Sequence, residues 1–282
     1  MPSAAVQPIV ALLSDLPGGN PTQYMIEKAF AHHDLDWRYL TVEVHPDDLA
    51  DAVRGMRAMG FRGGHCGHPH KKAVLPLLDR LSDTAETVGA ANVILREDDR
   101  LVGENTEGKG LLATLRKLAD PAGMRIVLLG AGKAGRAAAL ELAQAAAAEI
   151  TVVNRTAHRA GQLAEVLSEK FQIAATPLPW QDDYAPPAET DLLVNATSIG
   201  HADPQAAVPL ILDALESRTI VADMTPNPPQ TRLLRQAADR GCPTIDGLSM
   251  YIEQTAVAFQ RWTTVDPARD VMREAIEEFL EL

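Results

Sequence analysis

A glycine-rich turn between an apolar run and an alanine-rich segment constrains this sequence more than any other feature. Residues 126–129 are apolar, and Gly130, Gly132 and Gly135 follow in the order G-x-G-x-x-G. This order is typical of a strand, a tight turn and a helix, in which the helix N-terminus faces a pyrophosphate. The pattern predicts a dinucleotide-binding unit, in which the expected contacts are Gly130, Gly132, Lys133, Ala134 and Gly135. The alternative is a glycine-rich turn in an α/β protein that binds no cofactor.

The end of the next apolar strand indicates which dinucleotide is bound. Units that bind NAD usually carry an acid there, whereas this chain has Asn154, Arg155 and Thr156, with Arg159 close behind. An acid repels a 2′-phosphate, while arginine and a hydroxyl attract it. The sequence therefore predicts NADP rather than NAD. In the alternative interpretation, Arg155 is an ordinary solvated arginine at a strand end.

Composition narrows the class of protein. A chain of 282 residues is long enough for two domains, each with its own core. The net charge of −12 argues against non-specific binding to nucleic acid or to an anionic membrane. No apolar run is long enough to span a bilayer. The two cysteines lie far apart, and no basic segment precedes the first apolar stretch, so we expect a cytoplasmic protein without disulfides.

Strands and helices alternate along the chain, which predicts an α/β fold with mainly parallel sheets. Residues 61–70 are rich in glycine and histidine and are interpreted as a loop. A helix is expected to begin near His70 and to continue toward Leu81, and residues 103–110 are expected to form a hinge-like segment. We expect the active site between two domains, at the carboxyl ends of the nucleotide-domain strands.

Lys71 and Glu107 are the best candidates for proton chemistry. Both lie in segments rich in glycine and polar residues. A lysine has an ordinary pKa of about 10.4, and desolvation brings it toward neutrality, where it can exchange a proton with an alcohol. A carboxylate beside it can orient the amine or hold the substrate hydroxyl. The alternative is that Lys71 and Lys72 are a solvated pair and Glu107 is an exposed loop acid.

Several motifs resemble those of the shikimate/quinate dehydrogenase family. Residues 63–71 resemble its G-x-N-V-T-x-P-H-K loop, and residues 89–92 resemble the start of its G-A-x-N-T motif. Residues 103–108 resemble G-x-N-T-D-G, and residues 246–254 resemble D-G-x-x-M-L-x-x-Q. The segments at residues 195–200 and 223–224 resemble strand ends that line the nicotinamide side. The triplet 154–156 matches NADP-preferring members.

This resemblance implies an N-terminal α/β substrate domain (1–108), a doubly wound Rossmann-type NADP-binding domain (109–244), and C-terminal helices (245–282) that return to the first domain. It implies reversible hydride transfer between NADP(H) and a shikimate-like cyclic hydroxy or keto acid, a step of aromatic amino acid biosynthesis. We expect a monomer or a homodimer. Lys71 would be the catalytic lysine and Glu107 its partner acid. Asn92 and Gln254 would bind substrate, and the nicotinamide side would include Thr197, Met224 and Gly247.

The substrate-binding positions depart from the family pattern. His65 stands where the family has asparagine, and Gly67 where it has threonine. Pro226 replaces a tyrosine that helps to close the pocket. Asn20 and Thr22 occupy the positions of the S-x-S pair that holds the substrate carboxylate, and we expect both, with His65, to contact substrate.

These departures leave three functions open. The first is turnover of a shikimate-like acid. The second is the same fold acting on an amino- or otherwise substituted analogue, because loss of hydrogen bonds between the pocket and the substrate strongly changes discrimination between substrates. The third is an NADP(H)-binding regulator without activity. The retained Lys71, Asn92 and Gln254 argue against the third, since folding does not require these polar residues.

The segment 65–70 also allows a metal-binding interpretation, because it contains His65, Cys66, His68 and His70. Its end, however, matches a loop of the family that holds no metal. We therefore expect no metal, and expect one or two of the histidines to donate hydrogen bonds in the pocket.

Overall fold

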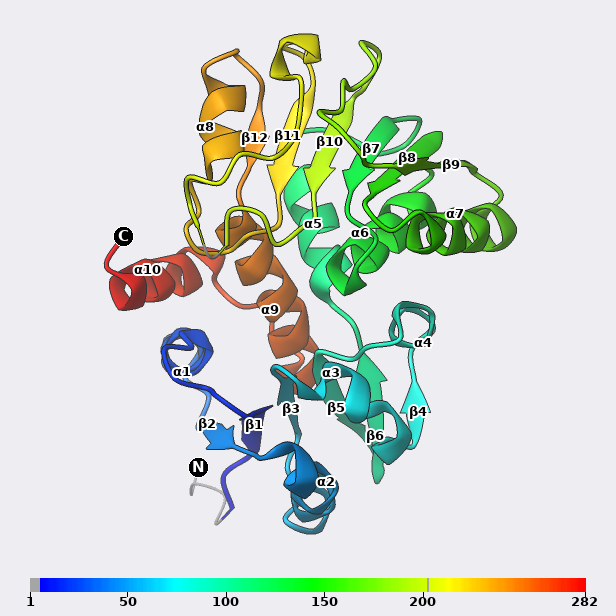
Figure 1. The fold of residues 1–282 in the computed structure, drawn as a ribbon. Helices are drawn as coiled ribbons and strands as arrows, with labels where there is room; N and C mark the ends of the chain where they lie inside the picture. Colours follow the sequence, from blue (N-terminus) through cyan, green and yellow to red (C-terminus); the bar gives the residue numbers. More distant parts are fainter. Residues whose placement is uncertain (1–5, 202) are drawn as a thin grey trace. The chain divides into compact units, whose positions relative to one another are not determined.

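The computed structural model describes residues 6–201 and 203–282. The observation that no basic segment precedes the first apolar stretch rests partly on residues 1–5, which lie outside the described residues. The chain divides into two compact units (Figure 1): unit 1 comprises Met1–Thr106 and Thr255–Leu282, and unit 2 comprises Glu107–Gln254. None of the helices in the described part is long and apolar enough to cross a membrane.

Unit 1 contains a six-stranded sheet in the order β2-β1-β3-β5-β6-β4. Its strands are β1 (Ile9–Ser14), β2 (Arg38–Glu43), β3 (Gly63–Cys66), β4 (Arg80–Leu81), β5 (Val93–Glu97) and β6 (Arg100–Glu104). Pairing is parallel except on the two sides of β5, which runs antiparallel to both β3 and β6. The sheet is therefore mixed. The antiparallel pairing of β5 with β6 follows from the short connection that joins them as a hairpin.

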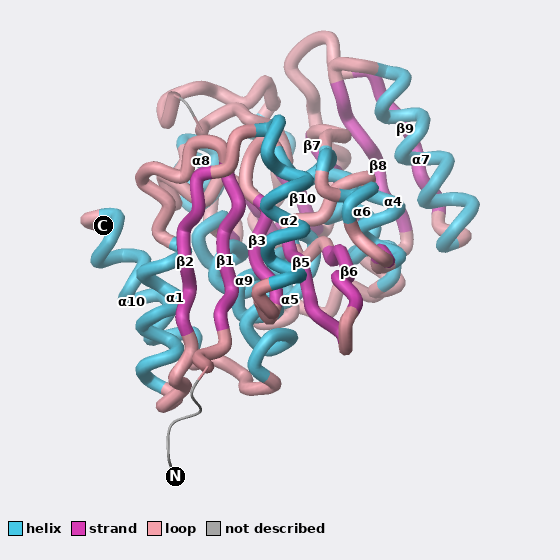
Figure 2. Tube along the Cα trace, turned by 90° about the horizontal axis from the view of Figure 1, so that it is seen from below, coloured by secondary structure: helices cyan, strands magenta, loops and turns pink. Residues whose placement is uncertain are grey.

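Helices pack on the sheet of unit 1. They are α1 (Thr22–His32), α2 (Leu49–Ala58), α3 (His70–Ala73), α4 (Asp83–Val88), the C-terminal part of α9 (Gly247–Thr263) and α10 (Arg269–Leu280). Short 3-10 turns lie at Pro46–Asp48 and Leu75–Leu77. The helices α1 and α10 lie side by side next to β2 (Figure 2). Phe30 of α1 packs on Phe259 of α9, with ring centroids 5.2 Å apart.

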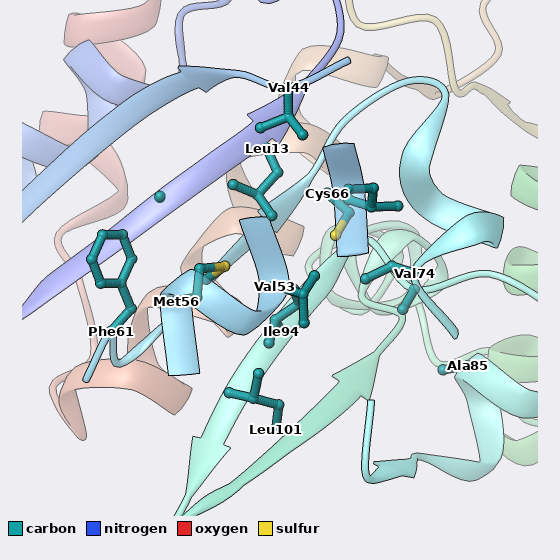
Figure 3. Close-up of a cluster of buried hydrophobic side chains, with 13 residues drawn as sticks. Leu13, Val44, Val53, Met56, Phe61, Cys66, Val74, Ala85, Ile94 and Leu101 are labelled. Atoms are coloured by element: carbon teal, nitrogen blue, oxygen red, sulfur yellow. The ribbon is translucent and has the colours of Figure 1, made fainter. Parts of the chain in front are cut away.

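The face of this sheet that α2 covers carries an aliphatic core (Figure 3). Helix α2 contributes Val53 and Met56, whose spacing places them on one helical face, toward Leu13 of β1 and Ile94 of β5. All four side chains are at most 3% exposed. Burial of this stripe against the sheet fixes β1 and β5, and the candidate residue Asn92 directly precedes β5.

Two local expectations were wrong. Residues 61–70 are not wholly a loop, because Gly63–Cys66 form the internal strand β3. The glycines there allow neighbouring strands to approach: a Cβ on Gly64 would lie 2.1 Å from the carbonyl oxygen of Ala11. The expected helix from His70 ends at Ala73, and Pro76 lies in the following 3-10 turn.

Unit 2 is a doubly wound parallel sheet. Its strands are β7 (Arg125–Leu129), β8 (Glu149–Asn154), β9 (Ala174–Pro179), β10 (Leu192–Asn195), β11 (Ile220–Asp223) and β12 (Thr244–Ile245). Its helices are α5 (Glu107–Leu115), α6 (Lys133–Gln144), α7 (Ala157–Phe171) and α8 (Arg232–Ala238), and a 3-10 turn lies at Leu212–Ala214. The strand order is β12-β11-β10-β7-β8-β9. This is the Rossmann arrangement, whose ligand binds where the order reverses, here between β7 and β10. The predicted α/β fold class is confirmed.

Candidate functional site

The glycine-rich turn has the geometry that a bound pyrophosphate needs. Gly130 has a φ of +100°, which an L side chain rarely adopts. A Cβ on Gly132 would meet nothing within 4 Å, so open space lies beside the backbone there. Gly135 has no room for a side chain, because α6 packs closely on the turn. The turn therefore leaves a phosphate free access to the chain.

The N-terminus of α6 completes this anion site. Gly132 is its N-cap residue, no side chain caps the helix, and its first turn contains no acid. The first turn includes Lys133, Ala134 and Gly135, the remaining predicted contacts of the turn. Uncapped N–H groups and the positive end of the helix dipole favour a bound phosphate.

A pocket of about 750 Å³ opens at the carboxyl ends of β7, β8, β9 and β10. Six predicted cofactor residues line it: Gly130, Gly132, Asn154, Arg155, Arg159 and Thr197. Ala196, Ser198 and Ile199 also line it and belong to the segment 195–200 that was expected on the nicotinamide side. Sequence reasoning missed the remaining lining residues: Trp180, Gln181, Asp182, Asp183 and Pro209. The volume and the two exposed arginines fit a phosphorylated dinucleotide.

Asn154 shapes this pocket through the backbone. Its Oδ1 accepts a hydrogen bond from the Ala131 N–H at 3.1 Å, and its Nδ2 donates to the Thr156 carbonyl oxygen at 2.9 Å. It thereby connects the glycine-rich turn to the segment that carries Arg155. Thr156, the N-cap residue of α7, is not among the lining residues.

The other predicted cofactor contacts lie at neighbouring strand ends of unit 2. Thr197 follows β10, and its hydroxyl donates to Asn195 Oδ1 at 2.7 Å. Met224 follows β11, and Gly247 begins α9 so close to Thr225 that a Cβ would lie 2.2 Å from its carbonyl oxygen. Neither Met224 nor Gly247 lines the pocket.

Backbone hydrogen bonds bring together three predicted residues of unit 1. Lys71 lies in the single turn of α3, and its carbonyl oxygen accepts from the Ala91 N–H at 2.8 Å. The carbonyl oxygen of the adjacent Asn92 accepts from the Cys66 N–H at 2.9 Å. The segments that carry Lys71, Asn92 and His65 are therefore neighbours.

The amide of Asn92 is largely engaged with Thr106. Asn92 is 5% exposed, and its Oδ1 accepts from the Thr106 N–H at 2.8 Å while its Nδ2 donates to the Thr106 hydroxyl at 3.0 Å. One N–H of this amide is left for another acceptor.

Two further predicted residues lie in unit 2. Glu107 is the first residue of α5, and Gln254 lies on α9 against Gly110 of α5.

Asn20 and Thr22 are bonded to each other. Asn20 Oδ1 accepts from the Thr22 N–H at 2.9 Å and also from the Thr22 hydroxyl. Thr22 is 2% exposed. The Thr22 hydroxyl proton is thus committed within the chain, which leaves the Asn20 amide N–H groups as the side-chain donors of this pair.

Ser14 occupies the space next to Gly67. A Cβ on Gly67 would lie 2.6 Å from Ser14 Oγ, which itself donates to the His68 carbonyl oxygen at 3.1 Å. The structure thus explains why glycine stands at this position of the loop, since a threonine side chain would collide with Ser14.

The histidines of the loop have separate partners. His70 is fully buried, and its Nε2 donates to the Val44 carbonyl oxygen at 2.8 Å. His65 instead contacts Tyr39, a residue that sequence reasoning missed.

Burial raises the pKa of the Cys66 thiol to about 12, although the charge of Lys71 opposes the shift. Across the described residues, no three His, Cys, Asp or Glu side chains are grouped to hold a metal ion.

Two family models match the chain. The model of the shikimate dehydrogenase substrate binding domain covers residues 22–94, and that of shikimate / quinate 5-dehydrogenase covers residues 113–208. A shikimate dehydrogenase (NADP(+)) of Methanopyrus kandleri is 38% identical and matches over 93% of this chain and 94% of its own.

Solved structures agree along nearly the whole chain. The ligand-free 5-ketofructose reductase of Gluconobacter sp. strain CHM43 has a TM-score of 0.94 and 41% identity, covering 98% of this chain and 99% of its own. The shikimate 5-dehydrogenase of Thermus thermophilus, in complex with NADP(H) and shikimate, has a TM-score of 0.83 and 33% identity, covering 97% and 100%. With relatives of this similarity along nearly their entire length, the chain belongs to the shikimate/quinate dehydrogenase family.

Proposed function

We propose that this protein transfers a hydride reversibly between NADP(H) and a hydroxyl-bearing carbon of a small polyhydroxylated substrate, with a shikimate-like hydroxy or keto acid as the first candidate. The chain is an NADP-dependent oxidoreductase that acts on a CH–OH group, as its sequence predicts. One observation carries the proposal: the open, uncapped helix N-terminus lies in a pocket that also contains two arginines.

The cofactor fits the residues that are present. The N-terminus of α6 and the turn at Gly130 and Gly132 would hold the pyrophosphate. Arg155 and Arg159 would bind the 2′-phosphate by charge-assisted hydrogen bonds. When bound, the nicotinamide supplies or accepts the hydride.

The chain's own residues manage the substrate and its proton. Lys71 donates a proton to the carbonyl oxygen during reduction and takes it back from the hydroxyl during oxidation. Glu107 orients the lysine and the substrate hydroxyl, and Asn92 and Gln254 hold the substrate through their amides. These roles follow the family motifs at residues 63–71, 89–92, 103–108 and 246–254.

A second candidate substrate is a polyhydroxy ketone without a carboxylate. The hydrogen bonds between Asn20 and Thr22 support it, because they occupy the hydroxyl expected to hold a carboxylate. The 5-ketofructose reductase with a TM-score of 0.94 is named for a ketone of this kind. Reduction of such a ketone needs the same hydride and the same proton from Lys71.

We also propose a cellular location, an oligomeric state and the kinds of partner for this enzyme. We expect the enzyme in the cytoplasm, because both cysteines are buried free thiols. Turnover of shikimate would place it in aromatic amino acid biosynthesis. We expect a monomer or a homodimer, with no nucleic acid or membrane as partner.

The test measures NADP⁺ reduction with shikimate and quinate, and NADPH oxidation with 3-dehydroshikimate and 5-ketofructose. We expect turnover of at least one pair, faster with NADP(H) than with NAD(H). Binding of NADPH without turnover of any of these compounds would contradict the proposal and indicate an NADP(H)-binding regulator.

A further inference from the structure

Tyr39 and His65 form a buried pair within unit 1. The Tyr39 hydroxyl on β2 lies 2.7 Å from Nδ1 of His65 on β3, although β1 separates these strands. Tyr39 is fully buried and His65 is 9% exposed. The Trp262 indole also packs against the imidazole, at 4.9 Å between centroids and nearly perpendicular to it. Trp262 is itself fixed by an Nε1–H bond to the Ile94 carbonyl oxygen at 3.0 Å. The imidazole orientation is therefore set by two contacts, with Tyr39 and with Trp262.

The protonation of His65 follows from its surroundings. Burial lowers the pKa of His65 to about 3, and the positive charge of Lys71 adds to the effect. The ring is thus neutral and carries one proton. A phenol is a better donor than a neutral imidazole, and an imidazole nitrogen is a better acceptor than a phenol oxygen. Tyr39 therefore donates to Nδ1, and the imidazole proton resides on Nε2.

Nε2 of His65 is available for a ligand. Within the part of the chain that the structure describes, it makes no hydrogen bond. Nδ1 of His70 is a fully buried side-chain atom with no hydrogen-bond partner, and Nε2 of His65 is not an atom of that kind. A neutral N–H donor held in one orientation, on the strand whose segment adjoins Lys71 and Asn92, is suited to recognise one oxygen of a substrate.

We propose that His65 is a specificity-determining residue that donates from Nε2 to an uncharged hydroxyl or carbonyl oxygen of a polyhydroxy ketone, and that Tyr39 positions it. This inference rests on the proposed function and favours its second candidate, an uncharged polyhydroxy ketone, as the substrate class of the same site. A hydroxyl can accept from Nε2–H and still donate elsewhere, which suits a substrate rich in hydroxyls.

The same surroundings disfavour a carboxylate. A carboxylate needs several donors when it leaves water, and of the Asn20–Thr22 pair only the Asn20 amide keeps N–H donors, because the Thr22 hydroxyl is committed to Asn20. Lys71, the nearby cation, is assigned to the reacting oxygen of the substrate. The Tyr39–His65 pair therefore selects an uncharged ligand, because it supplies one fixed N–H donor and no charge.

The experiment measures ligand binding by calorimetry on the full-length protein saturated with NADP⁺. The probes are D-fructose, the uncharged product expected from reduction of 5-ketofructose, and shikimate, the carboxylate-bearing candidate. The variants are His65→Asn, which restores the family residue, and Tyr39→Phe, which removes only the hydroxyl. Tyr24→Phe is the control, because its hydroxyl bonds Glu278 at 2.7 Å on the exposed surface.

We expect the wild-type protein to bind fructose more tightly than shikimate. Both variants should lower fructose affinity by about tenfold, the effect of one lost hydrogen bond, and change shikimate affinity by less than about twofold. Tyr24→Phe should change neither. In turnover, Tyr39→Phe should raise the KM for 5-ketofructose and preserve kcat, as a positioning role requires.

Two results would overturn this inference: tighter wild-type binding of shikimate, or equal losses for both ligands in both variants, which would indicate a structural role only. Turnover decides the proposed function separately. A protein that binds fructose through His65 but oxidises NADPH with neither ketone would keep the specificity pair and refute the proposed reaction.

Discussion

Gly135 packs against Gly130 so closely that a Cβ on Gly135 would lie 2.1 Å from the Gly130 carbonyl oxygen. The first helical turn and the end of β7 are thereby held together, which places the uncapped N–H groups of α6 beside the pocket. Gly132 differs, because a Cβ there would meet nothing within 4 Å. The two glycines thus serve packing and ligand access, respectively.

This contrast predicts opposite effects of two alanine substitutions. Gly135→Ala should lower the free energy of unfolding by about 1–3 kcal/mol, because the methyl group overpacks the turn. Gly132→Ala should leave stability unchanged or slightly higher, and lower NADP affinity about tenfold by obstructing the pyrophosphate. Urea unfolding and calorimetric titration with NADP⁺ measure the two effects. Equal NADP affinity of Gly132→Ala and the wild type would contradict the assignment of the turn.

Arg155 is predicted to determine the preference for NADP. Arg155→Ala should weaken NADP binding by about 1.5–3 kcal/mol through loss of a charge-assisted hydrogen bond, with little change for NAD. Arg116→Ala, an exposed arginine at the end of α5, is the matched control. Dissociation constants for both cofactors, measured at one salt concentration, test this. A wild-type protein that binds NAD and NADP equally well would refute the preference.

His65 makes stability depend on acid pH. Its folded pKa of about 3 lies below the ordinary value of 6.5, so unfolding takes up a proton between these values. The free energy of unfolding should therefore be fully retained above pH 6.5 and should fall by ~1.4 kcal/mol per pH unit below it. Burial is the larger cause of the shift, and Lys71 is the smaller.

Urea unfolding between pH 7.5 and pH 4.5 isolates this contribution. His65→Asn should lose stability less steeply than the wild-type protein, whereas His158→Asn, an exposed histidine, should follow the wild-type curve. Superimposable pH dependence of His65→Asn and the wild type would mean that His65 is not buried as a neutral ring.

Glu107 is predicted to act in the proton-transfer step. Glu107→Gln keeps the size of the side chain and loses its charge, so it should lower kcat. Glu107→Asp restores the family residue but shortens the side chain, and we expect it to lower activity on the natural substrate. Glu274→Gln, on the exposed face of α10, is the control. If Glu107→Asp raised shikimate turnover at no cost on another substrate, the protein would instead be a weakened shikimate dehydrogenase.

The nucleotide unit was predictable because its signals are local. The turn at Gly130, the strand before it and the strand that ends at Asn154 follow one another in sequence. The strand β3 was not recognised, because Gly63 and Gly64 resemble loop residues. Their absence of side chains instead permits contacts with Ile94 and Ala11, on strands distant in sequence.

The candidate site was predictable only where a motif marks it. The pairing of Tyr39 with His65 depends on side chains that reach across an intervening strand, and no local pattern carries this register. The residues after β9, Trp180–Asp183, carry no motif, although the shared edge of a parallel sheet was a usable signal. The bonding of Asn20 to Thr22 required atomic positions.

The most direct test of the proposed reaction is the turnover number of Lys71→Ala, measured beside NADPH affinity. If Lys71 carries the proton, kcat should fall by ~10²–10⁴, the usual range for a positioned acid or base, while the dissociation constant for NADPH stays the same. Lys72→Ala, the exposed neighbour, should retain wild-type kcat. A Lys71→Ala protein whose kcat stays within a few-fold of the wild-type value would contradict the proposed role of Lys71.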